Sequence, residues 1–267
     1  MVIADRNLLL RLIEVDRKCG PCIVSAYLEF KIFKSYRELE VFCNKVVESK
    51  TSISNVKIEA VRWCGMGLTL IPAKIAQHVL FDEDLTFAED KIYGFATWMN
   101  GYRIYLLKSD KPFAYDVNLP KLSNIYARMS FSEYLRGIWK KVLAFAYTYY
   151  TGSTLHTLLK FLNDVPGKRM LFHMINTLML VAGLASILIL HAMWGWIFIV
   201  AYLALNLLHL IKQYVLHCGS VGQAFKNLLK YQVFSICVLS LMPLIIFKNR
   251  QRFKHVMDMM ERAKCKL

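Results

Sequence analysis

Two adjacent carboxylates, Glu89 and Asp90, are the main candidates for acid–base chemistry in this chain. They follow the acidic stretch 81–86 (FDEDLT) and precede apolar residues at helical spacing, which predicts a helix that ends at Asn100-Gly101. Thr86 and Glu89 stand in a capping-box spacing. Asp90 is then expected in the first helical turn, where the helix dipole favours its ionised form. An ionised carboxylate within hydrogen-bond reach of a hydroxyl can act as a general base.

The same residues have a purely structural interpretation. Glu89 could simply close the capping box, and Asp90 could complement the helix dipole. Asp82, Glu83 and Asp84 are expected to form a solvated turn rather than a set of metal ligands. Both interpretations of Glu89 and Asp90 stay open from sequence.

The segment Cys19-Gly20-Pro21-Cys22 has the spacing of a redox dithiol. A redox site of this kind needs a strand before the motif and a helix after it, so that the helix dipole lowers the pKa of the first thiol. Here a helix-like run precedes the motif and a strand-like run follows it. A turn that holds two thiols is therefore the favoured interpretation, and a membrane-tethered thiol protein is the lesser alternative.

Short strands and helices alternate over residues 1–130, which predicts a partial α/β domain. Helices are expected over about 7–17, 35–50 and from Pro72 onward, in addition to the helix that carries Asp90. Strands are expected over about 22–30, 56–63, 68–71 and 102–107.

The second half of the chain has the composition of a membrane protein. The whole chain is 56% hydrophobic with a mean hydropathy of +0.36, and residues 170–211 carry no formal charge. Two transmembrane helices are predicted over about 170–190 and 195–212, and a third apolar run covers 231–247. Residues 131–169 mix aromatic and basic side chains, as interfacial amphipathic helices do, or as helices packed on a soluble domain do. A basic tail, 248–267, completes the chain.

The charge distribution points to a membrane surface as a partner. The formal net charge is +15, and the basic excess flanks the apolar segments, so membrane lipids are expected partners and nucleic acid is not. The chain is expected to be an integral membrane protein with its α/β portion in the cytosol. If Lys168 and Lys212 are cytosolic, a spanning third segment would put the basic tail outside. That segment is therefore expected to be re-entrant or interfacial, or residues 143–162 also cross.

Four polar residues lie within the predicted spans. They are expected to form hydrogen bonds between helices, or, as the alternative, a site for a lipid headgroup. The four are His173, Asn176, Asn206 and His209.

An ordered set of short motifs resembles the second half of a membrane-bound family 2 glycosyltransferase with the GT-A fold. The motifs are Gly65-Met66-Gly67, Phe81-Asp82-Glu83-Asp84-Leu85, Glu89-Asp90 and Gly101-Tyr102-Arg103-Ile104. The resemblance covers about residues 1–150, and the apolar helices behind it fit the membrane-bound branches of that family.

The resemblance implies roles for individual residues. Asp90 would be the catalytic base, with Glu89 as its supporting neighbour. Trp63, Gly65 and Gly67 would line the acceptor side. Arg136 and Trp139, in Arg136-Gly137-Ile138-Trp139, resemble the Gln-x-x-Arg-Trp element of processive members, although the order and spacing differ. Arg136 would therefore lie on the product or diphosphate side.

The resemblance also implies a hexosyl transfer from a nucleotide sugar to a lipid-linked or polysaccharide acceptor at the cytosolic face. The nucleotide-binding first half of the family is not found before Met1, so a separate N-terminal half is an expected partner. Asp5 stands where the family has an Asp-x-Asp motif for a divalent metal, Mg²⁺ or Mn²⁺, but the other position is Ile3, and one carboxylate makes a poor metal site. The alternative is a non-catalytic scaffold related to these enzymes.

Overall fold

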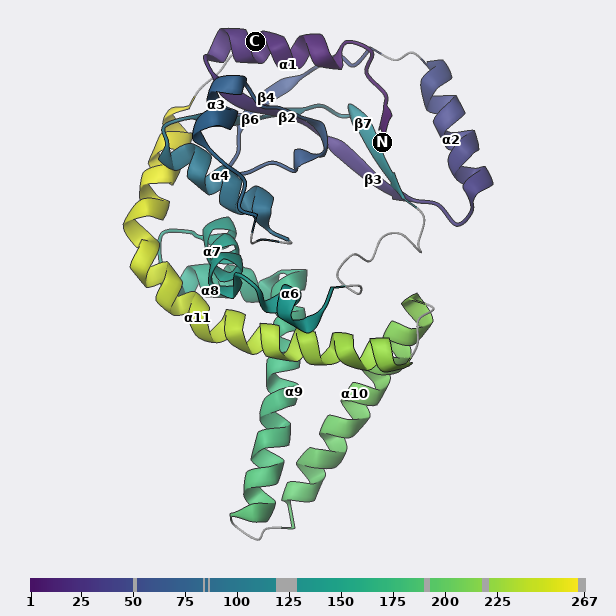
Figure 1. Cartoon of the computed structure of the whole chain (residues 1–267), viewed down its shortest axis with the longest axis vertical. Coiled ribbons are helices and arrows are strands. Elements are labelled where there is room, and N and C mark those ends of the chain that lie inside the picture. The colour runs from purple at the N-terminus through teal and green to yellow at the C-terminus, as the bar shows by residue number, and fades with distance from the viewer. Residues whose placement is uncertain are drawn as a thin grey trace. The chain divides into compact units, whose positions relative to one another are not determined.

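The computed structural model describes residues 1–49, 52–83, 85, 87–118, 129–189, 193–217 and 221–263 (Figure 1). The chain forms two compact units. The first contains Met1–Ser123 together with Asn249–Leu267, and the second contains Asn124–Lys248. The expected division into an α/β part and a helical part is confirmed at this level. The segment predicted as a separate basic tail instead continues a helix as far as Arg262, and Asn249–Leu267 belong to the first unit.

A four-stranded sheet with the order β4-β6-β2-β5 forms the centre of the first unit. Its strands are β2 (Cys22–Ala26), β4 (Lys57–Ala60), β5 (Thr69–Leu70) and β6 (Arg103–Lys108). The two central strands, β2 and β6, are parallel, and both outer strands run antiparallel to their neighbours. All five residues of β2 are buried, which explains its continuous run of small and apolar side chains.

A second sheet has three strands in the order β1-β7-β3. It contains β1 (Val2–Ile3), β3 (Leu28–Ile32) and β7 (Ala114–Asn118). The stretch predicted as one strand over 22–30 is therefore two strands, which separate at Tyr27 and belong to different sheets. The backbone N–H of Tyr27 donates to Leu107, whereas its carbonyl accepts from Phe113, so the change of sheet occurs at this residue.

Helices cover these sheets. They are α1 (Leu8–Cys19), α2 (Tyr36–Ser49), α3 (Ala73–His78) and α4 (Glu89–Met99), and each agrees with a helix expected from the sequence. Pro72 immediately precedes α3, as predicted. The last part of α11 (Val221–Arg262) also belongs to this unit, and the rings of Phe253 and Phe95 meet edge to face at 5.6 Å.

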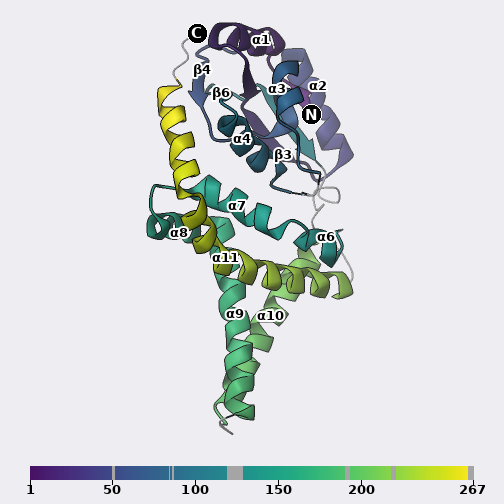
Figure 2. The ribbon, with the colours of Figure 1, turned by 60° about the vertical axis from the view of Figure 1, so that its left-hand side comes forward.

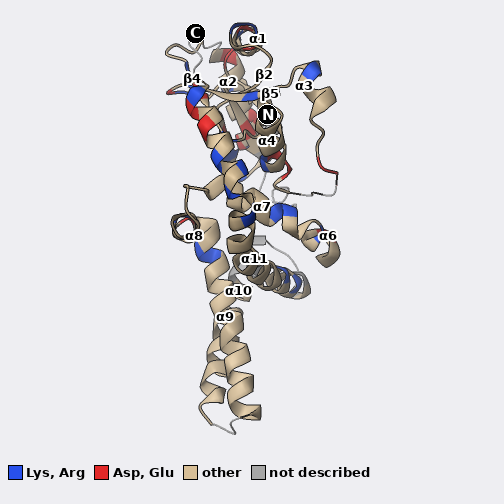
Figure 3. Cartoon of the chain, turned by 90° about the vertical axis from the view of Figure 1, so that its left-hand side faces the viewer, with Lys and Arg blue, Asp and Glu red and all other residues tan. Residues whose placement is uncertain are grey.

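The second unit is helical (Figure 2). It contains α6 (Phe131–Leu135), α7 (Ile138–Tyr149), α8 (Thr154–Asn163), α9 (Val165–Leu188), α10 (Gly195–His217) and most of α11. Among the described residues, Val165–Leu188 and Ala224–Arg262 are long and apolar enough to cross a membrane, and Gly195–Leu208 is a shorter apolar helix. In the hairpin of α9 and α10, the residues between Arg169 and Lys212 include no charged side chain (Figure 3).

Helix α9 is apolar on the outside and small or polar on the inside. Its buried residues are Gly167, His173, Asn176 and Gly183, whereas large aliphatic side chains such as Leu178 and Leu184 are exposed. This is the reverse of a helix on a water-soluble protein and is typical of helices that pack in lipid. A Cβ atom at Gly183 would lie 2.9 Å from the carbonyl oxygen of Gly195, so the two helices approach as closely as a glycine allows.

Buried polar side chains join the apolar helices. Gln232 Nε2 of α11 donates to Asn206 Oδ1 of α10 at 3.0 Å, which confirms the expected interhelical hydrogen bond for Asn206. The ring of His173 stacks on Tyr231 at 5.8 Å. Neither amide atom of Asn176 has a hydrogen-bond partner among the described residues. The side chain of His209 lies outside what the structure describes.

Candidate functional site

The carboxylates of Glu89 and Asp90 lie in the first turn of α4, as predicted. The predicted capping box is wrong, however, because the helix begins at Glu89 and the residue before it is Ala88, in the left-handed region with φ +65°. Ala88 has no side chain that could accept a hydrogen bond. Asp90 supplies part of what is missing, since its Oδ1 accepts the backbone N–H of Lys91 at 2.8 Å. Thr86 itself lies outside the described residues.

The surroundings of Asp90 act on its protonation in both directions. Partial burial raises the pKa of this carboxyl group above its ordinary value, and the charge of Glu89 raises it further. The charge of Lys91 and its backbone N–H lower the pKa, but burial has the larger effect. The expectation that the helix start alone favours the ionised form is therefore corrected: desolvation outweighs it. A raised pKa makes Asp90 a better proton acceptor near neutral pH.

Glu89 is a second unusual carboxylate in the same turn. Its Oε2 atom is buried and has no hydrogen-bond partner among the described residues. A buried carboxylate oxygen without a donor is unfavourable for folding, and such groups occur where a ligand or a proton completes the site.

Trp63 is held directly beside α4. A Cβ atom at Gly94 would lie 2.7 Å from Trp63 Cβ and 2.8 Å from the carbonyl oxygen of Arg62, so only glycine permits this packing. One turn further along α4, Trp98 Nε1 donates to the carbonyl of Val61 at 3.0 Å. At the start of the helix, Lys91 Nζ lies 5.1 Å from the centre of the Trp63 ring. The segment with Trp63 is thus fixed to the helix that carries Asp90.

The loop with Gly65 and Gly67 is anchored to the central sheet. Thr69 Oγ1 donates to the Gly65 carbonyl at 2.8 Å, and Ser25 Oγ of β2 donates to the carbonyls of Gly65 and Leu68 at 3.4 and 3.1 Å. A Cβ atom at Gly67 would lie 3.2 Å from Leu28 Cδ1. The loop is therefore held by hydroxyl groups that the sequence pattern did not single out.

Cys64, between Trp63 and the glycine loop, is a buried free thiol. Burial raises the pKa of its thiol to about 11, and the charge of Asp90 adds to this effect. The thiol is thus protonated at neutral pH. The structure therefore brings together three residues predicted for the site, Glu89, Asp90 and Trp63, whereas Gly65 and Gly67 lie in a loop that is anchored to the central sheet.

Asp5 does not fit the metal role that the resemblance gives it. The side chain is fully buried, and Oδ2 pairs with Arg11 Nε at 2.9 Å while Oδ1 accepts the backbone N–H of Asn7 at 3.0 Å. Both oxygens are thus engaged, Oδ2 in an ion pair and Oδ1 in a hydrogen bond to the backbone. No group of three or more metal-ligating side chains occurs in the described ranges.

Arg136 and Trp139 belong to the second unit. Arg136 directly follows α6 as its C-cap and is exposed, and Trp139, in the first turn of α7, is 39% exposed. Lys248 Nζ lies 5.9 Å from the centre of the Trp139 ring. These contacts give neither residue a chemical role.

The Cys19–Cys22 motif does not form a dithiol pair. Cys19 is in a disulfide bond, but not with Cys22, which is free and buried. Burial raises the pKa of the Cys22 thiol to about 12, so it is unreactive at neutral pH. The segment predicted as a turn with two thiols therefore holds one free thiol, Cys22, and one disulfide-bonded cysteine, Cys19.

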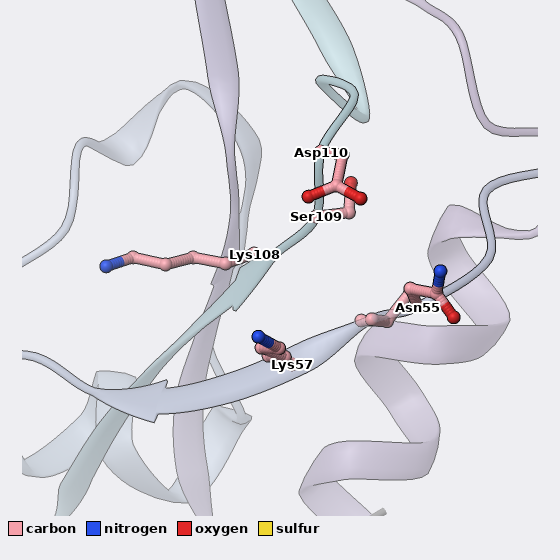
Figure 4. Close-up of a pocket in the computed structure, with 6 residues that line it drawn as sticks. Asn55, Lys57, Lys108, Ser109 and Asp110 are labelled. Atoms are coloured by element: carbon pink, nitrogen blue, oxygen red, sulfur yellow. The ribbon is translucent and has the colours of Figure 1, made fainter.

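A surface pocket lies near the start of β4 and the end of β6. It is lined by Asn55, Val56, Lys57, Lys108, Ser109 and Asp110 (Figure 4). The amino group of Lys108 points away from the other polar groups and pairs with Glu59. The polar side chains do not converge, so this pocket is a weaker candidate than the turn with Asp90.

Sequence reasoning missed Ser25, Thr69, Lys91 and Gly94, which position the site. Of these, only Lys91 could have been found from the sequence, because it is the direct neighbour of Asp90.

Comparison with protein-family models, curated proteins and solved structures finds no match for this chain.

Proposed function

We propose that this chain is the acceptor-side part of a membrane-bound glycosyltransferase with Asp90 as its catalytic base. The observation that supports this most is the half-buried Asp90 carboxylate, with a raised pKa, at the start of a helix that is locked against Trp63. The acceptor would be a lipid-linked or polysaccharide hydroxyl, and the donor a nucleotide sugar. The apolar helices of the second unit would hold the enzyme in the bilayer, with the α/β unit on the cytosolic face.

The chemistry that this assigns to the chain is a single displacement. Asp90 takes the proton of the acceptor hydroxyl while that oxygen forms a bond to the anomeric carbon. The bond between the anomeric carbon and the nucleotide diphosphate breaks, and the diphosphate leaves with the electron pair. Trp63, which packs against the helix that carries Asp90, would offer a ring face to the acceptor sugar. Because Asp5 is held by Arg11, we assign the metal and the diphosphate to a separate donor-binding half.

Sugar transfer in membranes tests the proposal. Membranes that contain the chain and its donor-binding partner are incubated with radiolabelled UDP-glucose, UDP-N-acetylglucosamine or GDP-mannose. Asp90→Asn is expected to lower incorporation at least about 100-fold. Glu83→Gln removes a carboxylate from an exposed position of the preceding turn and is expected to keep incorporation within about twofold. Equal incorporation by wild type and Asp90→Asn would exclude Asp90 as the base.

A non-catalytic scaffold is the second candidate, and the Asp5–Arg11 ion pair favours it. That pair turns the one acidic residue expected at the donor side into a structural element. A scaffold predicts no incorporation of any of the three sugars, together with a cellular phenotype of Asp90→Asn that equals wild type.

A further inference from the structure

Strand β3 is the outer strand of the three-stranded sheet. It pairs with β7 along one side only, so its other side offers backbone N–H and C=O groups that no strand among the described residues uses. The side chains of Phe30 and Ile32 are 53% and 55% exposed. Proteins usually protect such an edge, and an unprotected apolar edge pairs readily with another strand.

The sequence of β3 is self-complementary in the antiparallel direction. Its five residues, Leu28-Glu29-Phe30-Lys31-Ile32, have a central aromatic residue, opposite charges on either side of it and aliphatic residues at the ends. If two copies pair antiparallel about Phe30, Phe30 faces its own copy and Glu29 faces Lys31 of the other copy. Leu28 then faces Ile32. Aromatic, oppositely charged and aliphatic pairs are the cross-strand pairs that stabilise a sheet.

The two faces of β3 support this pairing. Glu29 and Lys31 lie on the same face, with Lys31 Nζ 3.5 Å from Glu29 Oε1 and 4.8 Å from the ring centres of Phe42 and Tyr115. Because side chains alternate along a strand, Phe30 and Ile32 lie on the opposite face. In a pair of β3 strands, both charged pairs would cross on one face and a continuous apolar row would form on the other.

We propose that two copies of this chain associate through antiparallel pairing of β3 about a two-fold axis at Phe30. About a two-fold axis every contact occurs twice, so the contact of Glu29 with Lys31 of the other copy is repeated as Lys31 with Glu29. The same holds for Leu28 and Ile32, whereas Phe30 meets its own copy. A strand of five residues buries less surface than a stable soluble dimer needs, so the dissociation constant is expected to be micromolar or weaker. This inference is independent of the proposed enzymatic function.

Cross-linking tests the register. In the proposed dimer, the two Cα atoms of residue 30 are about 4.5–5.5 Å apart, which suits a disulfide bond. Phe30→Cys in the full chain is therefore expected to give a covalent dimer under mild oxidation. The matched control is Ile32→Cys, whose two copies would be four residues apart along the strands, about 13 Å, and should not cross-link. Wild type reports the background from the native cysteines. Equal cross-linking of both variants, or none with Phe30→Cys, would overturn the proposed register.

Charge exchange tests the complementarity. The dimer dissociation constant of the full chain in detergent is measured by sedimentation. Glu29→Lys places like charges opposite each other at two symmetric positions and is expected to weaken the dimer about fivefold to tenfold. The double variant Glu29→Lys with Lys31→Glu restores opposite charges and should return within about twofold of wild type. A monomeric wild type, species larger than a dimer, or a double variant as weak as Glu29→Lys would each contradict the proposal.

Discussion

At the scale of single residues, the candidate site combines groups that are unfavourable for folding. Asp90 is half-buried with a raised pKa, and Glu89 has a buried oxygen without a hydrogen-bond partner among the described residues. Two adjacent carboxylates in such surroundings lower the stability of the folded chain at neutral pH. Residues that lower stability are common where a protein needs them for binding or chemistry.

Asp90→Asn is expected to raise the melting temperature at pH 7. The pKa of Asp90 is higher in the folded chain than its ordinary value of 3.8, so the folded chain binds this proton more tightly than the unfolded chain. The destabilisation is complete above the folded pKa and vanishes as the pH falls below 3.8. Thermal melting in detergent at pH 7 and pH 4.5 should therefore show a gain that shrinks at the lower pH. A loss of stability at pH 7 would mean that the ionised carboxylate is structurally required.

Asp5→Asn is expected to have the opposite effect on stability. It leaves Arg11 without the buried carboxylate that Nε contacts at 2.9 Å, and breaking such a pair costs about 3 kcal/mol. The melting temperature should fall by several degrees, whereas Asp116→Asn, at an exposed position of β7, should change it little. If Asp5 bound a divalent metal instead, added Mg²⁺ or Mn²⁺ would raise the melting temperature of wild type and not of Asp5→Asn.

At the scale of elements, the site depends on how closely α4 approaches the segment that precedes β5. That approach is set at Gly94, in the middle of α4, and continues to the Trp98 hydrogen bond. Because Asp90 lies one turn before Gly94 on the same helix, the distance between the carboxylate and Trp63 depends on this glycine.

Gly94→Ala tests this packing. Alanine is normally better than glycine in a helix, by about 1 kcal/mol. Here the added Cβ would lie 2.7–2.9 Å from backbone and Cβ atoms that cannot rotate away, so we expect a net loss of about 1–3 kcal/mol. The measurement is the melting temperature, with Gly65→Ala as the control because a Cβ there meets nothing within 4 Å. A variant as stable as wild type would show that α4 and the Trp63 segment can separate without cost.

The sequence predicts most helices of this chain and fewer of its strands. Helices α2 and α4 follow from apolar residues at helical spacing, a local signal. Strand β7 was missed because it is stabilised by pairing with β1 and β3, which are remote in sequence. The break at Tyr27 was missed because both strands have the same composition. The support of the glycine loop by Ser25 and Thr69 joins residues 44 positions apart, so no local pattern reports it.

At the scale of the whole molecule, the two units differ in what they expose. The first unit buries apolar side chains such as Val24 and Ile104, as water-soluble domains do. In the second unit, α9 buries two glycines and two polar residues and exposes its aliphatic side chains. This difference supports the proposal that the second unit lies in a bilayer while the first meets water.

Leucine-to-lysine substitutions distinguish a bilayer from water around each unit. Leu178 on α9 and Leu10 on α1 are both exposed, 56% and 68%, so in water neither replacement would cost much. If α9 spans a membrane, Leu178→Lys places a charge among lipid tails at a cost of about 2.5–3.5 kcal/mol, whereas Leu10→Lys stays in water. We therefore expect Leu178→Lys to lower the fraction of protein that resists alkaline extraction from membranes, and Leu10→Lys to leave it unchanged. Equal behaviour of the two variants would mean that the exposed face of α9 meets water or protein, and the membrane part of the proposed function would fail with it.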